Sequence, residues 1–299
     1  MTIFEGSAVA LVLPMFDNGD IDFEGFKKQV QRMIDGGVQA LLVNGTTGET
    51  ATITIEDEFK LLDLTLELAK GTGVKVICGA GSNDTQTALK KARYAKEKGA
   101  DAILVVTPYY NKATQKGLIA HYTAIANAVP ETPLIMYNVP SRTGCNIQPA
   151  TAAYLAKNVK NIVGIKEATG DLSQIAKMMS LADGQLELYS GNDDQVLPIL
   201  SLGGLGVISV LSNVAPKFTH DMVMKYFDGD TKGATEDQLK ALPLINALFS
   251  EVNPIPVKTA MNLMGMNVGP LRMPLCEMEE DTKAALAKEI EKFGLKLAK

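Results

Sequence analysis

Short apolar runs recur along the chain, and segments with the spacing of amphipathic helices separate them. Short runs rich in β-branched side chains are typical of parallel strands that are buried on both faces. The pattern predicts eight strands, at Ala8–Leu13, Ala40–Val43, Val74–Cys78, Ala102–Val106, Leu134–Tyr137, Ile162–Ile165, Leu186–Tyr189 and Gly206–Val210.

The segments between these runs carry helix-start signals as well as helical spacing. Asp22 and Asp84 stand where a short polar side chain can accept hydrogen bonds from the first N–H groups of a helix. The predicted helices include Phe23–Ile34, Glu56–Ala69, Thr85–Lys98, Gln115–Ala128 and Leu172–Ala182.

Eight strand–helix units in succession predict an α/β protein of the (β/α)8 TIM-barrel class. A doubly wound sheet is the alternative, but it rarely needs eight regular units. The glycine-rich segment Gly79–Asp84 also lacks the third glycine of a dinucleotide-binding loop.

The short apolar runs that predict strands stop recurring near Gly229, and only helical patterns follow. We therefore expect a catalytic barrel over residues 1–228 and a C-terminal helical extension over 229–299 that packs on the barrel. The extension is predicted to hold helices at Thr235–Phe249, Pro256–Met264 and Glu279–Leu297, with a turn at Asn253–Pro256.

Composition narrows the class of partner and the compartment. The net charge is −5 and no basic run stands out, so we expect no nucleic-acid partner. The N-terminus lacks the pattern of a signal peptide, and no apolar run reaches the length of a membrane span, so a cytoplasmic protein is expected. Three scattered cysteines and two histidines predict reduced thiols and no metal site.

Lys166 directly follows the predicted strand Ile162–Ile165. Burial would lower the pKa of this lysine from about 10.4, toward a neutral amine that can attack a carbonyl group. The alternative is an ordinary lysine whose side chain extends past the strand end into solvent.

Polar side chains also follow other predicted strands, where barrel active sites form. The turn at 44–49 has two glycines with hydroxyls between them, which suits a small anion such as a carboxylate. Tyr137 could move protons if its neighbours lowered its pKa of about 10. Arg142 could bind a carboxylate through its planar guanidinium. Taken singly, these are also typical of a polar turn, a packed tyrosine and a surface ion pair.

Together, an amine, a proton carrier and a carboxylate cradle are the parts of a Schiff-base aldolase. Five motifs in this order resemble the 4-hydroxy-tetrahydrodipicolinate synthase (dihydrodipicolinate synthase) family of pyruvate-dependent class I aldolases. They are G-T-T-G-E at 45–49, V-T-P-Y-Y-N at 106–111, Y-N-V-P-S-R-T-G at 137–144, G-I-K-E-A-T-G at 164–170 and S-G-N-D-D at 190–194, and N-P-I-P-V-K at 253–258 extends the likeness.

The resemblance implies a lyase that condenses pyruvate with L-aspartate 4-semialdehyde, the first committed step of diaminopimelate and lysine biosynthesis. It makes Lys166 the amine that forms an imine with pyruvate, and Tyr137 the proton shuttle. Thr46 and Tyr110 are expected to complete a hydroxyl relay with Tyr137, and Tyr109 to reach across a dimer interface. The resemblance implies no cofactor and no metal.

The resemblance also implies the groups that bind the substrates. Thr47 and nearby backbone amides are expected to bind the pyruvate carboxylate, and Gly191 and Ile208 to contribute backbone to the pocket. Arg142 is expected to bind the carboxylate of the semialdehyde. Related N-acetylneuraminate lyases and keto-deoxy sugar acid aldolases share the Schiff-base lysine and are the alternative, although neuraminate lyases usually lack this arginine. A non-catalytic binding barrel is a more distant alternative.

The family further implies a homotetramer built as a dimer of dimers, with a lysine effector cleft between two subunits. In lysine-sensitive members this cleft carries a histidine and a glutamate at positions that match Glu58 and Thr87, whereas Asn83 and Tyr109 match the family. We therefore predict weak or absent inhibition by lysine.

Overall fold

The computed structural model of the protein describes residues 2–298. Eight parallel strands close into one barrel in chain order, from β1 to β8. This topology confirms the predicted TIM-barrel class. Among the described residues, every helix is too short or too polar to span a lipid bilayer.

The chain forms two compact units. The first unit comprises the residues up to Glu5 together with Lys75–Ile208, and the second comprises Gly6–Val74 together with the chain from Ser209 onward. The predicted boundary between the barrel at 1–228 and the extension at 229–299 rests only on where the strand-like apolar runs stop, and it stays a prediction.

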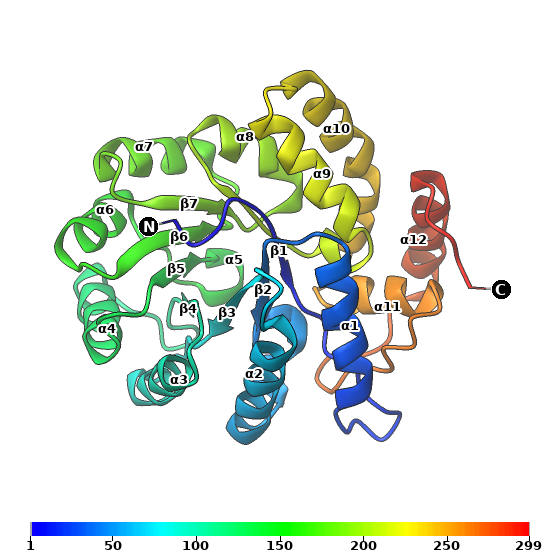
Figure 1. Cartoon of the computed structure of the whole chain (residues 1–299), viewed down its shortest axis with the longest axis horizontal. Helices are drawn as coiled ribbons and strands as arrows, with labels where there is room; N and C mark the ends of the chain where they lie inside the picture. Colours follow the sequence, from blue (N-terminus) through cyan, green and yellow to red (C-terminus); the bar gives the residue numbers. More distant parts are fainter. Residues whose placement is uncertain (1, 299) are drawn as a thin grey trace. The chain divides into compact units, whose positions relative to one another are not determined.

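The first unit alternates strands and helices, and in Figure 1 helices α4, α6 and α7 lie on the outer side of strands β5 to β7. Its elements are β3 (Lys75–Gly79), α3 (Thr85–Lys98), β4 (Ala102–Val106), α4 (Gln115–Ala128), β5 (Leu134–Asn138), α5 (Pro140–Thr143), α6 (Pro149–Asn158), β6 (Ile162–Glu167), α7 (Leu172–Ala182), β7 (Glu187–Ser190) and α8 (Val196–Ser201). Strand β8 (Gly206–Ser209) begins in this unit.

The second unit holds the first two strands, their helices and the C-terminal helices (Figure 1). Its elements are β1 (Gly6–Ala10), α1 (Phe23–Asp35), β2 (Ala40–Val43), the 3₁₀ turns Thr46–Gly48 and Thr50–Thr52, α2 (Ile55–Ala69), α9 (Pro216–Phe227), α10 (Thr231–Leu248), α11 (Ile255–Leu263) and α12 (Glu280–Phe293).

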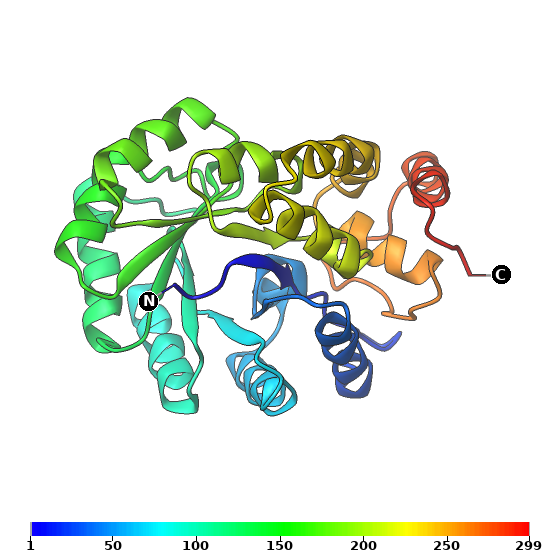
Figure 2. The same cartoon turned by 45° about the horizontal axis from the view of Figure 1, so that its top comes forward.

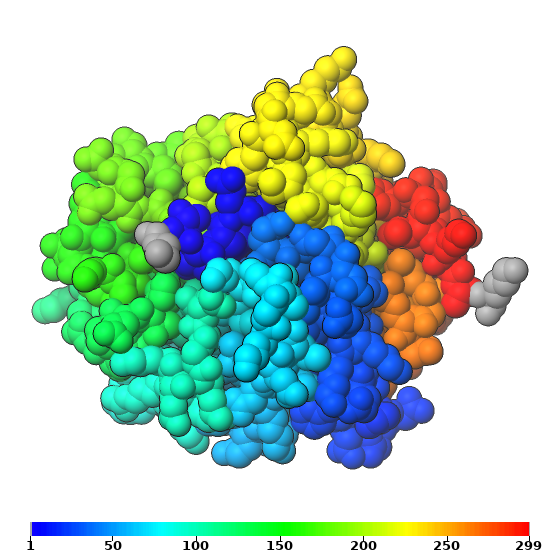
Figure 3. Space-filling model, in the orientation of Figure 1, coloured from blue at the N-terminus to red at the C-terminus, as the bar shows by residue number. Residues whose placement is uncertain are grey.

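The C-terminal helices share one core with barrel residues of the second unit. Val12, which follows β1, is buried with Leu248 of α10, Val257 of α11 and Ile290 of α12. Helices α10, α11 and α12 contact one another and lie together in Figure 2, and Figure 3 shows the red atoms of α12 against the yellow and orange atoms of the preceding helices. The predicted packing of the extension on the barrel is therefore confirmed within this unit.

Two predicted elements end three or more residues earlier than expected, whereas β8, α10 and α11 each end one residue earlier. Strand β1 ends at Ala10, and the Val12 N–H donates to Asn213 Oδ1 at 3.1 Å, so a side chain takes the place of a strand partner. Helix α12 ends at Phe293 because Gly294 adopts a left-handed conformation with φ 99°. Glycine reaches this conformation without the Cβ clash that other residues suffer, so it terminates the helix.

Candidate active site

Lys166 lies inside strand β6, one residue before its end, and pairs with Tyr137 of β5 and Tyr189 of β7. Its side chain is buried, with only 5% of the residue exposed. Burial lowers the pKa of Lys166 to about 8, although the Asp193 carboxylate raises it, while Arg142 lowers it further. The alternative of a lysine that extends into solvent is therefore wrong, and the amine is partly neutral near physiological pH.

Tyr137 lies beside this amine. The Lys166 Nζ is 4.4 Å from the centroid of the Tyr137 ring. Burial raises the pKa of Tyr137 to about 12, because the desolvation of a phenolate and the Glu167 charge outweigh the opposing effect of Arg142. The condition that neighbours lower this pKa is therefore not met in the ligand-free protein, in which Tyr137 is a neutral phenol.

Gly191, which follows β7, lies against the aliphatic stem of Lys166. A Cβ atom at this position would be 2.8 Å from Ala168 Cβ and 3.1 Å from Lys166 Cε, closer than ordinary van der Waals contact. The Gly191 N–H also donates to the Glu167 carbonyl at 2.7 Å. The structure thus brings Gly191 to Lys166, and the absence of a side chain leaves room for the amine.

Asn138 and Glu167 form a polar pair at the ends of β5 and β6. The sequence analysis did not identify this pair. They are register partners on β5 and β6, directly after Tyr137 and Lys166. The Asn138 Nδ2 donates to both Glu167 carboxylate oxygens, at 3.3 and 3.2 Å, and the Thr169 N–H donates to one of them at 3.0 Å. Burial raises the pKa of Glu167 to about 7 despite these hydrogen bonds. Adjacent side chains of a strand point to opposite faces, so the second of two polar residues at a strand end lies on the other face from the first. Such a polar pair at the end of both predicted strands was the signal that could have identified Asn138 and Glu167.

Arg142 lies in the last turn of the short helix α5, where Gly144 ends the helix in a left-handed conformation. The side chain is exposed, and its positive charge lowers the pKa of both Lys166 and Tyr137. Arg142 is therefore close enough to the amine to act on it electrostatically, as a residue at the mouth of the site should be.

The two adjacent tyrosines differ strongly in exposure. Tyr109 is 40% exposed, whereas Tyr110 is 91% exposed and has a left-handed backbone with φ 69°. A side chain this exposed is not part of a buried relay within its own chain. Tyr110 is therefore not buried with Tyr137 within its own chain, and the expected roles of the two tyrosines stay a prediction.

The turn at residues 44–49, called the carboxylate turn after the role expected of it, lies in the second unit, directly after β2. Residues Thr46–Gly48 form one 3₁₀ turn, and Glu49 follows in a left-handed conformation. Thr46 is exposed, whereas Thr47 is buried and its Oγ1 accepts a hydrogen bond from Asn253 Nδ2 at 3.1 Å. Ile208 lies in the first unit at the end of β8 and is 1% exposed.

The residues expected at the effector cleft fall in both units. In the first unit the Asn83 carbonyl accepts from Asn111 Nδ2 at 2.9 Å, which ties the tyrosine loop to it. Thr87 lies in the first turn of α3, where its N–H and hydroxyl donate to the Asp84 carboxylate at 2.8 and 2.6 Å. Glu58 lies in α2 of the second unit and is buried.

A cavity of about 740 Å³ lies in the second unit, and Lys258 lies in its wall. All of its lining residues belong to the second unit, and Lys166 and Tyr137 are not among them. Within residues 2–298, no group of three or more His, Cys, Asp or Glu side chains is placed to hold a metal ion.

Comparisons with known proteins place this geometry in a family. Residues 3–293 match the model of the dihydrodipicolinate synthetase family. A Lachnoclostridium phytofermentans protein named 4-hydroxy-tetrahydrodipicolinate synthase is 52% identical over 99% of this chain and 100% of its own length. The dihydrodipicolinate synthase structure from Thermotoga maritima has a TM-score of 0.94 and 44% identity, covering 99% of this chain and 100% of that one. The Cyanidioschyzon merolae enzyme, solved with lysine bound, has a TM-score of 0.96 and 38% identity, with coverage of 99% and 100%. The chain belongs to the dihydrodipicolinate synthetase family.

Proposed function

We propose that this chain is a 4-hydroxy-tetrahydrodipicolinate synthase that condenses pyruvate with L-aspartate 4-semialdehyde, the first committed step of diaminopimelate and lysine biosynthesis. The observation that carries the proposal is the buried amine of Lys166, with a pKa of about 8 and a position 4.4 Å from the Tyr137 ring. The near full-length similarity to proteins named as this synthase supports the choice of substrates.

The first step is imine formation. With a pKa of about 8, about a tenth of the Lys166 amine is neutral at pH 7, and this form attacks the ketone carbon of pyruvate. The resulting carbinolamine loses its hydroxyl as water when a proton is delivered to the oxygen. Tyr137 is protonated in the free enzyme and lies beside the amine, so it is the donor we assign.

The second step is loss of a proton from the pyruvate methyl group. The protonated imine withdraws electrons, so the methyl carbon gives its proton to the Tyr137 phenolate and becomes a nucleophilic enamine. The positive charge of the protonated imine stabilises the phenolate form of Tyr137 and so lowers its pKa. This effect offsets the burial that raises the pKa of Tyr137 in the free enzyme. Tyr137 thus first donates a proton and then accepts one.

The last steps form the carbon–carbon bond and the ring. The enamine carbon attacks the aldehyde carbon of the semialdehyde, which restores the protonated imine, and the aldehyde oxygen takes up the proton that Tyr137 accepted from the methyl group. The amino group of the adduct then attacks the imine carbon, which breaks the bond to Lys166 and releases the cyclic product. Arg142, exposed at the end of α5, is the group we assign to the semialdehyde carboxylate.

We assign the pyruvate carboxylate to Thr47 and the neighbouring backbone N–H groups, and a relay role to Thr46. Support comes from the turn itself, which presents two hydroxyls and ends in the left-handed Glu49. Gly191 and Ile208 are assigned to the wall of the pyruvate pocket, and the room that Gly191 leaves beside Lys166 supports its part in this role.

For the tyrosine pair we propose the reverse of the expected roles. Tyr110, rather than Tyr109, reaches a second copy of the chain and supplies the third hydroxyl of that copy's relay. The support is its 91% exposure, compared with 40% for Tyr109. A large aromatic side chain held in solvent by a left-handed backbone is better explained by a partner surface. This proposal requires at least a dimer, and we retain the homotetramer as the assembly.

We also propose a cytoplasmic location. The chain has three free cysteines, two of them buried, which fits a reducing compartment.

The test is a coupled condensation assay with pyruvate, aspartate semialdehyde, a reductase and NADPH. We expect turnover in the natural protein, none with Lys166→Ala, and a fall of about a hundredfold with Arg142→Ala, equivalent to loss of about 3 kcal/mol. Lys217→Ala is the matched control, because Lys217 pairs only with Asp221 on the exposed face of α9.

Two other outcomes would replace the proposal. If turnover were absent but borohydride still trapped a pyruvate adduct on Lys166, the substrate would be a sugar-derived keto acid instead. If no adduct formed either, the barrel would be a binding protein without imine chemistry.

A further inference from the structure

Glu49 ends the carboxylate turn in an unusual conformation. Its φ is 53°, in the left-handed region that residues with a side chain seldom adopt. It directly follows the turn Thr46–Gly48, and its N–H donates to the Thr46 carbonyl at 3.0 Å. The position of Glu49 therefore fixes how the chain leaves the turn. Such a conformation persists only where surrounding contacts hold it.

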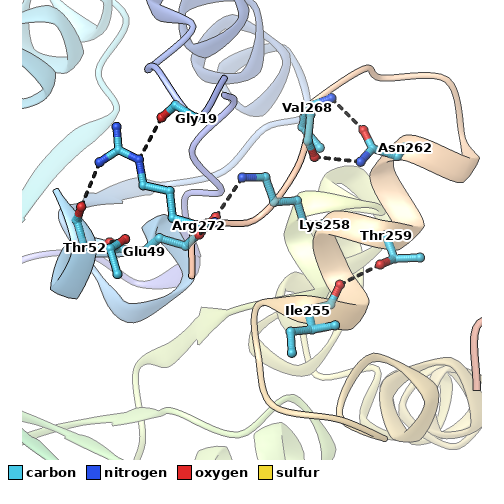
Figure 4. Close-up of polar contacts among 10 residues, drawn as sticks. Gly19, Glu49, Thr52, Ile255, Lys258, Thr259, Asn262, Val268 and Arg272 are labelled. Atoms are coloured by element: carbon cyan, nitrogen blue, oxygen red, sulfur yellow. Dashed lines mark hydrogen bonds and ion pairs between the residues drawn. The ribbon is translucent and has the colours of Figure 1, made fainter. Parts of the chain in front are cut away.

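Those contacts come from helix α11 and from the loop that follows it. The Glu49 Oε1 accepts a hydrogen bond from Lys258 Nζ of α11 at 2.7 Å, and both side chains are only 1% exposed. The other carboxylate oxygen accepts from the Arg272 N–H at 2.8 Å. Figure 4 shows Lys258 extended toward Glu49 and Arg272. A buried carboxylate with two donors is held in both position and orientation.

Further hydrogen bonds fix the residues on either side of Glu49. The Arg272 side chain donates to the Thr52 carbonyl and to the Gly19 carbonyl, both at 2.7 Å (Figure 4). Asn253, just before α11, donates to Thr47 Oγ1 at 3.1 Å. Because the Thr47 oxygen accepts this bond, its own hydrogen is left to donate in another direction.

We propose that Lys258 is a positioning residue for pyruvate binding. Its ion pair with Glu49 holds the Thr46–Gly48 turn in the geometry that receives the pyruvate carboxylate. This inference rests on the proposed function, because that function assigns the carboxylate to this turn. In this proposal Lys258 acts only through Glu49, with which its Nζ pairs at 2.7 Å.

The competing explanation is an ion pair that stabilises the fold and does nothing for the substrate. Loss of one partner of a buried ion pair is destabilising in either case, so stability alone does not distinguish the two. The pyruvate concentration needed for half-maximal imine trapping does, because only the positioning role changes the affinity of folded protein for pyruvate.

The experiment measures borohydride trapping of pyruvate on Lys166 as a function of pyruvate concentration. The variants are Lys258→Met, Lys258→Arg and Glu49→Gln, and the control is Lys217→Met, which removes an exposed ion pair of the same unit. We expect the half-maximal concentration to rise about tenfold in Lys258→Met and Glu49→Gln, less in Lys258→Arg, and not at all in the control. The KM for aspartate semialdehyde should stay within about twofold of the natural value.

Folded variants that melt at a lower temperature but keep the natural pyruvate dependence would overturn the inference. If Lys258→Met fails to fold, Lys258→Arg and Glu49→Gln give the same decision, because they keep most of the side-chain volume. Trapping does not require the semialdehyde. A natural protein that traps pyruvate without turnover would therefore refute the proposed function, while the pyruvate dependence of the variants still decides the role of Lys258.

Discussion

At the scale of single residues, the chemistry depends on one amine in a dry environment. Lys166 is buried and carries a pKa of about 8, and the largest cause is the cost of desolvating its ammonium group. The Asp193 carboxylate favours the charged form and Arg142 opposes it. The reactivity of Lys166 is therefore a balance that neighbouring charges can shift.

This balance predicts the pH dependence of imine formation. The trapping rate at low pyruvate should rise with pH and level off above a midpoint near the Lys166 pKa of about 8, because only the neutral amine attacks. Arg142→Gln removes a charge that lowers this pKa, so its midpoint should move to higher pH. Borohydride trapping that is stopped at fixed times, in buffers of equal ionic strength, measures the midpoint of the natural protein and that of the variant. An identical midpoint in the variant would show that Arg142 does not act on the amine.

A side chain at position 191 is predicted to collide with Lys166. In Gly191→Ala the new Cβ meets Ala168 Cβ at 2.8 Å and Lys166 Cε at 3.1 Å, so the lysine stem must move. We expect kcat to fall at least about tenfold. Gly117→Ala in α4 is the control, because its Cβ would meet Ala113 and Thr114 just before the helix at an ordinary contact distance of 3.5 Å. Equal kcat values for the two variants would contradict the account.

At the scale of elements, the pairing of β5 with β6 places Tyr137 opposite Lys166. The next pair in the register, Asn138 and Glu167, is joined by side-chain hydrogen bonds on the other face of the sheet. This pair fixes the register at the strand ends where Tyr137 and Lys166 lie, since a slip by one residue would exchange the two faces.

Glu167 predicts a pH-dependent contribution to stability. Its folded pKa of about 7 lies above the ordinary value of 4.5, so the folded state binds more protons than the unfolded state between these values. The contribution of Glu167 to stability is therefore complete below about pH 4.5 and falls by up to about 3 kcal/mol as the pH rises through about 7. Glu167→Gln removes this titration. The melting temperature of the natural protein relative to the variant should be higher near pH 5 than near pH 8, and a constant difference would refute the prediction.

The same elements show what the sequence could and could not predict. Apolar runs located all eight strands because parallel strands are buried on both faces, but they missed the polar ends Asn138 and Glu167, which continue the ladder. The motifs located Lys166 and Arg142. The raised pKa of Tyr137 and the exposure of Tyr110 depend on tertiary surroundings and on a backbone angle, neither of which the pattern contains. The Glu49–Lys258 pair joins residues 209 positions apart, a separation that no local pattern can read.

At the scale of the whole molecule, the C-terminal helices do more than complete a core. In the second unit they bury apolar residues with Val12, α11 supplies Lys258 to Glu49, and the segments that flank α11 supply Asn253 to Thr47 and Arg272 to Glu49. Truncation before Asn253 would remove Asn253, Lys258 and Arg272 from the carboxylate turn. The extension is thus part of the machinery that holds this turn.

Regulation by lysine is predicted to be weak or absent. Thr87 offers no carboxylate to an ammonium group, and its hydroxyl already donates to the Asp84 carboxylate that caps α3. We expect lysine at millimolar concentration to leave the condensation rate nearly unchanged. The measurement is the coupled assay with added lysine, and inhibition at micromolar lysine would refute the prediction.

The central claim is that Lys166 forms an imine with pyruvate. The most direct measurement treats the natural protein and Lys166→Met with pyruvate and borohydride, then locates the reduced adduct by peptide mass spectrometry. We predict one adduct, on the peptide that contains Lys166, and none in the variant. An adduct on a different lysine, or no adduct in a folded natural protein, would contradict the account.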